Sequence, residues 1–122
     1  MFEYLNLVDP YLFSFFQAFL LTFSAELLIL LLLAKKVHTS RIFKAVLIGN
    51  LVSMPVVWFL ISASIREFHI YLITSELFAI LSESFILKLF LSISYRRSLF
   101  YSLVANLFSF SIGWISSILF LF

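Results

Sequence analysis

Four polar side chains lie inside long apolar stretches of the sequence, where they could bind a cation or carry a proton. They are Glu26, Asn50, Glu83 and Asn106. Carboxylate and carboxamide oxygens suit hard cations, and carboxyl groups within a membrane serve in proton relays. The structural alternative is that these side chains hydrogen-bond between helices and fix the helix register. The residues leave both roles open, and they do not identify a metal.

Glu76 extends this polar set along the third apolar stretch. It precedes Glu83 by seven residues, so both side chains lie on one face of a helix. The matching region of the first half, near Phe19 and Leu20, is apolar. Glu76 is therefore a further candidate for an ion or proton site, without a counterpart in the first half.

The residues for other kinds of chemistry are missing or misplaced. The chain has no cysteine, which excludes disulfides and thiolate metal sites. Both histidines, His38 and His69, are expected in loops, so no haem ligand lies within an apolar stretch. The serines have no histidine or lysine partner at helical spacing, as nucleophilic catalysis would need. We therefore expect a protein that is not an enzyme and carries no cofactor.

The composition assigns these residues to a membrane protein. The chain has 122 residues, of which 64% are apolar and only 11% charged. Soluble domains average about 45–50% apolar and about 25% charged residues, and they need polar side chains to cover their surface. The 122 residues are therefore expected to form a single integral membrane domain in the cell membrane.

Four stretches are long enough to cross a bilayer, which takes about 20 apolar residues in a helix. They cover roughly residues 12–34, 42–64, 70–94 and 98–121. The stretches are continuous rather than alternating, which excludes a barrel and predicts four helices. Short connections make neighbouring helices antiparallel, as in an up-down bundle. Pro55 should kink the second helix, because it removes one helical hydrogen bond.

The basic residues predict the orientation of the four helices. The first and third connections carry basic residues and no acid, whereas the second holds Arg66 beside Glu67 and the N-terminal segment holds Glu3 and Asp9. By the positive-inside rule, the first and third connections are cytoplasmic and both termini lie outside. The basic side chains could also contact anionic lipid headgroups; these candidates are Lys35, Lys36, Arg41, Arg96 and Arg97.

The two halves of the sequence resemble each other. At an offset of 56 residues, Asn50, Leu51, Ser53 and Trp58 recur as Asn106, Leu107, Ser109 and Trp114, and Arg41 recurs as Arg97. Glu26 recurs as Glu83 at an offset of 57. This pattern predicts an all-α four-helix bundle of two repeated hairpins, about residues 12–64 and 70–121, related by a parallel pseudo-two-fold axis along the membrane normal. Each hairpin should bring one glutamate and one asparagine together at similar depth.

Two functions fit this architecture. The first is a small cation or proton transporter or channel, or a subunit of one, that uses the glutamates and asparagines. The second is a non-catalytic accessory or assembly subunit in which the same residues hold the helices together. Four helices leave little room for a permeation path, so we expect a homo-oligomer or a larger membrane complex. Membrane lipid is the other expected partner, and nothing indicates nucleic acid.

Overall fold

The computed structural model describes residues 10–120, and this part of the chain is helical without strands. The order along the chain is α2 (Pro10–Leu33), α3 (Thr39–Pro55), the π-helix η1 (Val56–Ile61), α4 (Ser62–Ser64), α5 (Phe68–Leu91) and α6 (Tyr95–Phe120). The segments α3, η1 and α4 form one continuous helical rod, so four helices are long and apolar enough to cross a membrane. The four predicted spans are confirmed as helices to within a few residues.

Side chains at the connections define where the helices begin and end. The His38 ring accepts a hydrogen bond from the Ser40 amide at the start of α3, and Glu67 accepts one from the Ile70 amide at the start of α5. Both contacts satisfy amides that have no partner within the helix. At the other end of α5, Ser92 takes a left-handed conformation with φ 53°. This ends α5 at Leu91, three residues before the predicted boundary.

His69 lies in the first turn of α5 rather than in a loop. The expected loop position was therefore wrong, although the residue still lies at the end of the helix.

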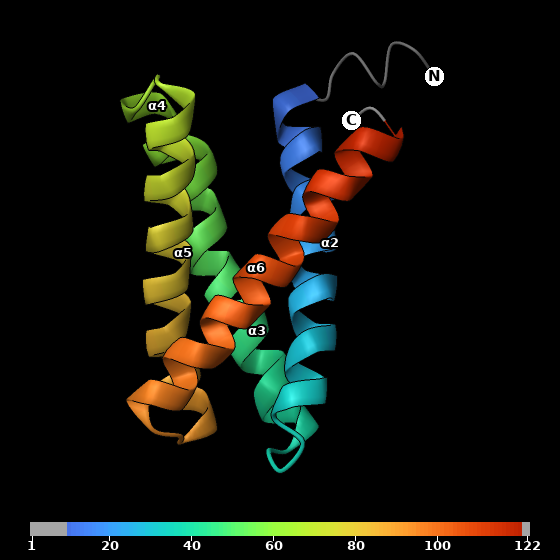
Figure 1. Ribbon diagram of the computed structural model, residues 1–122, viewed down its shortest axis with the longest axis vertical. Coiled ribbons are helices and arrows are strands. Elements are labelled where there is room, and N and C mark those ends of the chain that lie inside the picture. The colour runs from blue at the N-terminus through green and yellow to red at the C-terminus, as the bar shows by residue number, and fades with distance from the viewer. Residues whose placement is uncertain (1–9, 121–122) are drawn as a thin grey trace.

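The four long helices form an up-down bundle (Figure 1). We call α2 with α3 the first hairpin and α5 with α6 the second hairpin. Each helix packs on its neighbour in the order α2, α3, α5, α6, and α6 packs back against α2. Figure 1 shows that α6 crosses the bundle obliquely, so that α2 and α6 lie together at the end opposite the two hairpin connections.

The buried apolar core lies near the hairpin connections. It is formed by the ends of α2 and α5 and the beginnings of α3 and α6; its residues are Leu30, Ala34, Ile42, Ala45, Val46, Leu87, Leu91 and Ala105. Their small and branched side chains allow close packing there. We call these eight residues the apolar plug.

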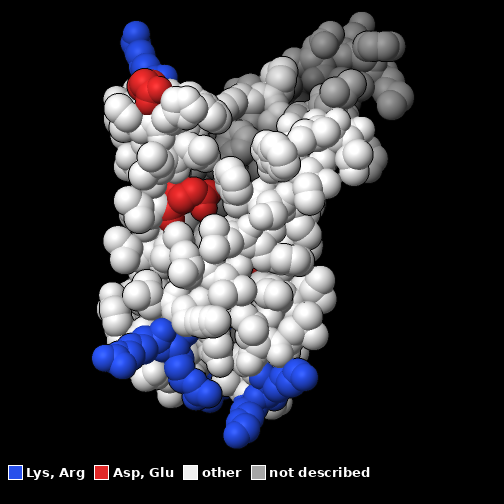
Figure 2. Space-filling view, viewed as in Figure 1, with Lys and Arg blue, Asp and Glu red and all other residues white. Residues whose placement is uncertain are grey.

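The end with the hairpin connections is also the basic end of the molecule. Figure 2 shows basic side chains, in blue, gathered at this end. At the opposite end it shows acidic surface, in red, next to basic surface. The basic side chains of the two hairpin connections are exposed, and the opposite connection carries exposed Arg66 and Glu67. Glu3 and Asp9, which contribute to the predicted orientation, lie outside the described residues.

The predicted disturbance at Pro55 takes the form of a π-helix. Residues Val56–Ile61 directly follow Pro55 and form a π-helix. Backbone hydrogen bonds in a π-helix join residues five positions apart, rather than four as in an α-helix. Side-chain hydroxyls then bind the carbonyls of this segment: Tyr71 donates to Val57 at 3.4 Å, and Tyr11 and Ser62 donate to Trp58. Such hydroxyl donors are a common way to satisfy carbonyls in an interrupted membrane helix.

Candidate functional site

Glu26 is buried at the centre of the bundle and hydrogen-bonded through both of its carboxyl oxygens. Asn50 Nδ2 donates to Oε1 at 3.0 Å, and Ser109 Oγ donates to Oε2 at 3.3 Å. Only 1% of Glu26 and 0% of Asn50 are exposed. The first hairpin therefore brings its glutamate and its asparagine together, as their similar depth predicts.

Glu83 has a different partner from the one predicted. Ser53 Oγ donates to Glu83 Oε2 at 3.2 Å, whereas Asn106 Nδ2 donates to the Ser102 carbonyl of its own helix at 2.8 Å. Both Glu83 and Asn106 are buried, so they share the bundle interior without forming the expected glutamate–asparagine hydrogen bond. A serine from the first hairpin binds the glutamate of the second instead.

The two serines were absent from the predicted site, although the sequence contains a signal for them. Ser53 and Ser109 match at the same offset of 56 residues as Asn50 and Asn106. In the structure each serine donates to the glutamate of the other hairpin. We call Glu26, Glu83, Ser53, Ser109 and Asn50 the central polar cluster.

Glu26 and Glu83 also lie near each other in the bundle interior. A carboxyl group donates a hydrogen bond only when it is protonated, so a direct bond between them would need one proton on the pair. The glutamates come from α2 and α5, which lie across the bundle from each other. The central polar cluster therefore connects all four long helices.

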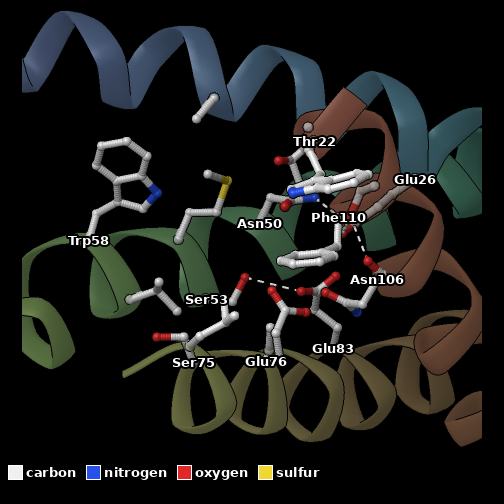
Figure 3. A pocket seen from close by; sticks show the side chains of 18 of the residues that line it. Thr22, Glu26, Asn50, Ser53, Trp58, Ser75, Glu76, Glu83, Asn106 and Phe110 are labelled. Atoms are coloured by element: carbon white, nitrogen blue, oxygen red, sulfur yellow. Dashed lines mark hydrogen bonds between the residues drawn. The ribbon is translucent and has the colours of Figure 1, made fainter. Parts of the chain in front are cut away.

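A cavity of about 420 Å³ adjoins the cluster on the side away from the apolar plug. Figure 3 shows side chains from all four long helices surrounding it. Its polar lining consists mainly of Glu26, Asn50, Ser53, Glu76, Glu83 and Asn106, and its aromatic lining includes Trp58, Phe110 and Trp114. In Figure 2, acidic surface is visible at the bottom of a hollow in the face between the two ends. Glu76 thus joins the other candidates in one cavity.

The arrangement of acidic side chains does not favour a metal ion. Among residues 10–120, no three histidine, cysteine, aspartate or glutamate side chains come close enough to hold one. Both oxygens of Glu26 are already occupied by hydrogen bonds from Asn50 and Ser109. None of the eight residues of the apolar plug lines this cavity.

The candidate headgroup residues lie at the basic end, and one of them has a role within the protein. Arg41 donates from Nε to the Phe90 carbonyl and from Nη2 to Ser92 Oγ, both at 2.9 Å. It therefore binds the carbonyl end of α5, where positive charge is favourable. Lys35, Lys36, Arg96 and Arg97 are exposed, as contact with lipid headgroups would require.

Comparison with known proteins finds one partial similarity. Residues 70–122 match the family described as "Filament integrity protein FraC". The match covers less than half of the chain and corresponds to the second hairpin, with Glu76, Glu83, Asn106 and Ser109 inside it. No curated protein and no solved structure matches the chain. The second hairpin is thus similar to part of a family of filament integrity proteins.

Proposed function

We propose that this protein is a non-catalytic assembly subunit of the cell membrane, in which the central polar cluster holds two hairpins together. The observation that carries this proposal is the exchange of hydrogen bonds between the hairpins. Ser109 of the second hairpin donates to Glu26, and Ser53 of the first hairpin donates to Glu83. Hydrogen bonds of this kind fix the register of membrane helices.

A pseudo-two-fold axis along the membrane normal would relate these two contacts. Under the offsets of the sequence repeat, Glu26 corresponds to Glu83 and Ser53 to Ser109, so one contact is the counterpart of the other. Arg41 and Arg97 are a further corresponding pair. Arg41 binds the end of α5, and Arg97 lines a small pocket with Leu33 and Ala34 at the end of α2. These contacts support two repeated hairpins around a common axis.

The partial family similarity also favours an assembly role. The family that resembles the second hairpin is described by filament integrity, and an assembly role agrees with that description. An assembly role further agrees with the apolar plug, because none of its eight residues lines the polar cavity. In our proposal the basic end faces the cytoplasm and both termini lie outside, following the positive-inside rule.

The surface through which the protein would assemble lies on α2. Ser14, Gln17, Leu21 and Ser24 recur at heptad spacing and form one stripe, which we call the α2 stripe. The three polar members are exposed, although lipid offers no hydrogen bond at that depth. Gln17 carries both donors and an acceptor, so it can pair with Gln17 of a second copy. We therefore propose that two copies associate through this stripe.

Cysteine crosslinking in membranes tests this association. The chain contains no cysteine, so single cysteines report on one position each. Ser14→Cys and Ser24→Cys should give oxidised dimers, because both positions lie on the α2 stripe. Phe16→Cys is the matched control, since Phe16 is 55% exposed but lies on another face of α2.

The crosslinking pattern also gives the outcome that contradicts the proposal. If Phe16→Cys forms dimers as efficiently as the two stripe variants, the dimers reflect random collision. If none of the three variants crosslinks, the α2 stripe is not an interface.

The second candidate function is proton or cation transport, as a transporter, a channel or a subunit of one. The cavity favours it, because Glu76, Glu83 and Asn50 lie where a permeating ion would need polar groups. Flux into liposomes separates the two functions. An assembly subunit gives no flux above empty liposomes, whereas a transporter gives flux that Glu26→Gln and Glu83→Gln abolish in a folded protein.

A further inference from the structure

The cavity beside the central polar cluster combines hydrogen-bond acceptors with aromatic walls. Glu76 and Glu83 are acidic, and Trp58, Phe110 and Trp114 lie around the same space (Figure 3). The volume of about 420 Å³ falls within the range of about 300–1,000 Å³ that is usual for small-molecule sites. The cavity is therefore large enough for an organic ligand.

Two of its acceptor groups are unused. The carboxamide oxygen Oδ1 of Asn50 has no hydrogen-bond partner, although Asn50 is 0% exposed and lines the cavity. Within residues 10–120, the half-buried carboxyl group of Glu76 also makes no hydrogen bond. A buried acceptor without a donor costs free energy, so a ligand that donates a hydrogen bond to Asn50 Oδ1 would be stabilised in the cavity.

The charge and the aromatic lining define the chemical class of that group. No basic side chain lines the cavity, and its carboxyl groups favour a cation. A metal ion is disfavoured because no three ligand side chains converge within residues 10–120. Aromatic rings attract organic cations through their faces, and apolar walls suit a carbon skeleton.

We propose that this cavity binds a small organic ammonium ion with an apolar body. Its N–H groups would donate to Glu76 and to Asn50 Oδ1, and its body would lie against the aromatic side chains. A primary or secondary ammonium fits better than a quaternary one, because Asn50 Oδ1 requires a donor. This inference does not depend on the assembly role, since ligand binding is measured without reference to oligomeric state.

The tryptophans provide a direct measurement. The chain contains two tryptophans, and both line the cavity. We expect 2-phenylethylammonium to change the tryptophan fluorescence of the purified, folded protein in a saturable way. The neutral analogue 2-phenylethanol has a similar shape and should give no saturable change at the same concentrations.

Two variants assign the binding to the cavity. Glu76→Gln removes the charge and should weaken binding of 2-phenylethylammonium by about tenfold, the usual effect of losing a charge-assisted hydrogen bond. Glu67→Gln is its matched control, because Glu67 is exposed at the start of the same helix and does not line the cavity. Trp114→Leu removes an aromatic wall and should weaken binding about threefold; Trp114 is 62% exposed, so the fold should tolerate this change.

Three results would overturn the proposal. Equal saturable responses to 2-phenylethanol and 2-phenylethylammonium would show that the cavity binds apolar molecules without selecting for an ammonium group. Unchanged affinity in both Glu76→Gln and Trp114→Leu would place the ligand elsewhere. The same fluorescence change with calcium chloride alone would assign the cavity to a metal ion.

Discussion

At the scale of single residues, the central polar cluster explains how two glutamates can lie inside a bundle of apolar helices. A charged residue at the centre of a membrane helix costs at least about 2.5 kcal/mol. Glu26 offsets this cost with donors to both oxygens, and Glu83 with the hydroxyl of Ser53. The donors come from two other helices in the case of Glu26, so the same contacts that satisfy the carboxyl group also connect the helices.

A pair of double-mutant cycles tests these contacts. We expect Glu26→Ala with Ser109→Ala, and Glu83→Ala with Ser53→Ala, to give similar coupling energies of about 0.6 kcal/mol, the average for polar contacts between membrane helices. The two hydroxyl-to-carboxyl distances are nearly equal, 3.3 and 3.2 Å. Reversible unfolding in mixed detergent micelles measures each free energy of unfolding.

A serine outside the cluster provides the control for these cycles. Ser111 lies on α6 like Ser109, but its hydroxyl donates to the Leu107 carbonyl of the same helix. Ser111→Ala with Glu26→Ala should therefore give no coupling. Coupling in one main cycle but not in the other would contradict the correspondence between the two hairpins.

The sequence predicts part of the cluster and misses the rest for a physical reason. Depth along the helices places Glu26 beside Asn50, and the structure has that hydrogen bond. Depth does not determine the side-chain rotamer, and Asn106 turns back to the Ser102 carbonyl of its own helix. The hydroxyls of Ser53 and Ser109 are short, so their contacts depend on how closely the helices approach, which sequence spacing does not specify.

At the scale of the helices, close approach of α3 to α5 depends on a glycine. A Cβ atom at Gly49 would lie 3.3 Å from Glu83 Cγ, whereas a Cβ atom at Gly113 would meet nothing within 4 Å. Both are helical and neither has a positive φ. Only Gly49 is therefore required by packing.

Alanine substitution at the two glycines should have opposite effects. Gly113→Ala should raise the free energy of unfolding by up to about 1 kcal/mol, because alanine favours a helix. Gly49→Ala should lower it, since overpacking of a tight contact costs about 1–3 kcal/mol. The same unfolding measurement compares them, and a Gly49→Ala protein as stable as Gly113→Ala would show that the contact with Glu83 is loose.

The helices themselves are largely predictable, and their irregularities are not. Continuous apolar stretches predict four helices, because a membrane leaves few other ways to satisfy the backbone. Pro55 indicates a disturbance in the second one, yet a π-helix over Val56–Ile61 depends on hydroxyl donors from other helices. Tyr11 and Tyr71, which bind the Trp58 and Val57 carbonyls, lie far away in sequence.

At the scale of the whole molecule, the charge distribution predicts the orientation in the membrane. Single cysteines at Ser40 and Ser94, both exposed at the basic end, should be protected in intact cells from a reagent that cannot cross the membrane. A cysteine at Ser64, exposed at the opposite end, should react. The reason is the positive-inside rule. Labelling of Ser40→Cys and Ser94→Cys, together with protection of Ser64→Cys, would show that the protein has the opposite orientation.

Composition predicts the class of the molecule but not its cavity. An apolar content of 64% predicts a membrane protein, because too few polar residues remain to cover a soluble surface. The cavity arises because the helices pack closely at the apolar plug and separate beyond it, with α6 crossing obliquely (Figure 1). Crossing angles depend on side-chain packing along whole helices, and the positions of Glu76 and Trp114 in one cavity follow from them.

The central claim, that the protein is an assembly subunit, is tested most directly by self-association in lipid. Labelled copies are mixed in bilayers, and energy transfer between them is followed as added lipid dilutes the protein. We expect a dimer whose dissociation constant rises by about threefold to twentyfold in Gln17→Leu, as for the loss of an interhelical hydrogen bond worth about 0.6–1.7 kcal/mol. Phe16→Leu, on another face of α2, should leave it unchanged. Energy transfer no greater than that of randomly mixed monomers, or equal association of Gln17→Leu and the unmodified protein, would contradict the account.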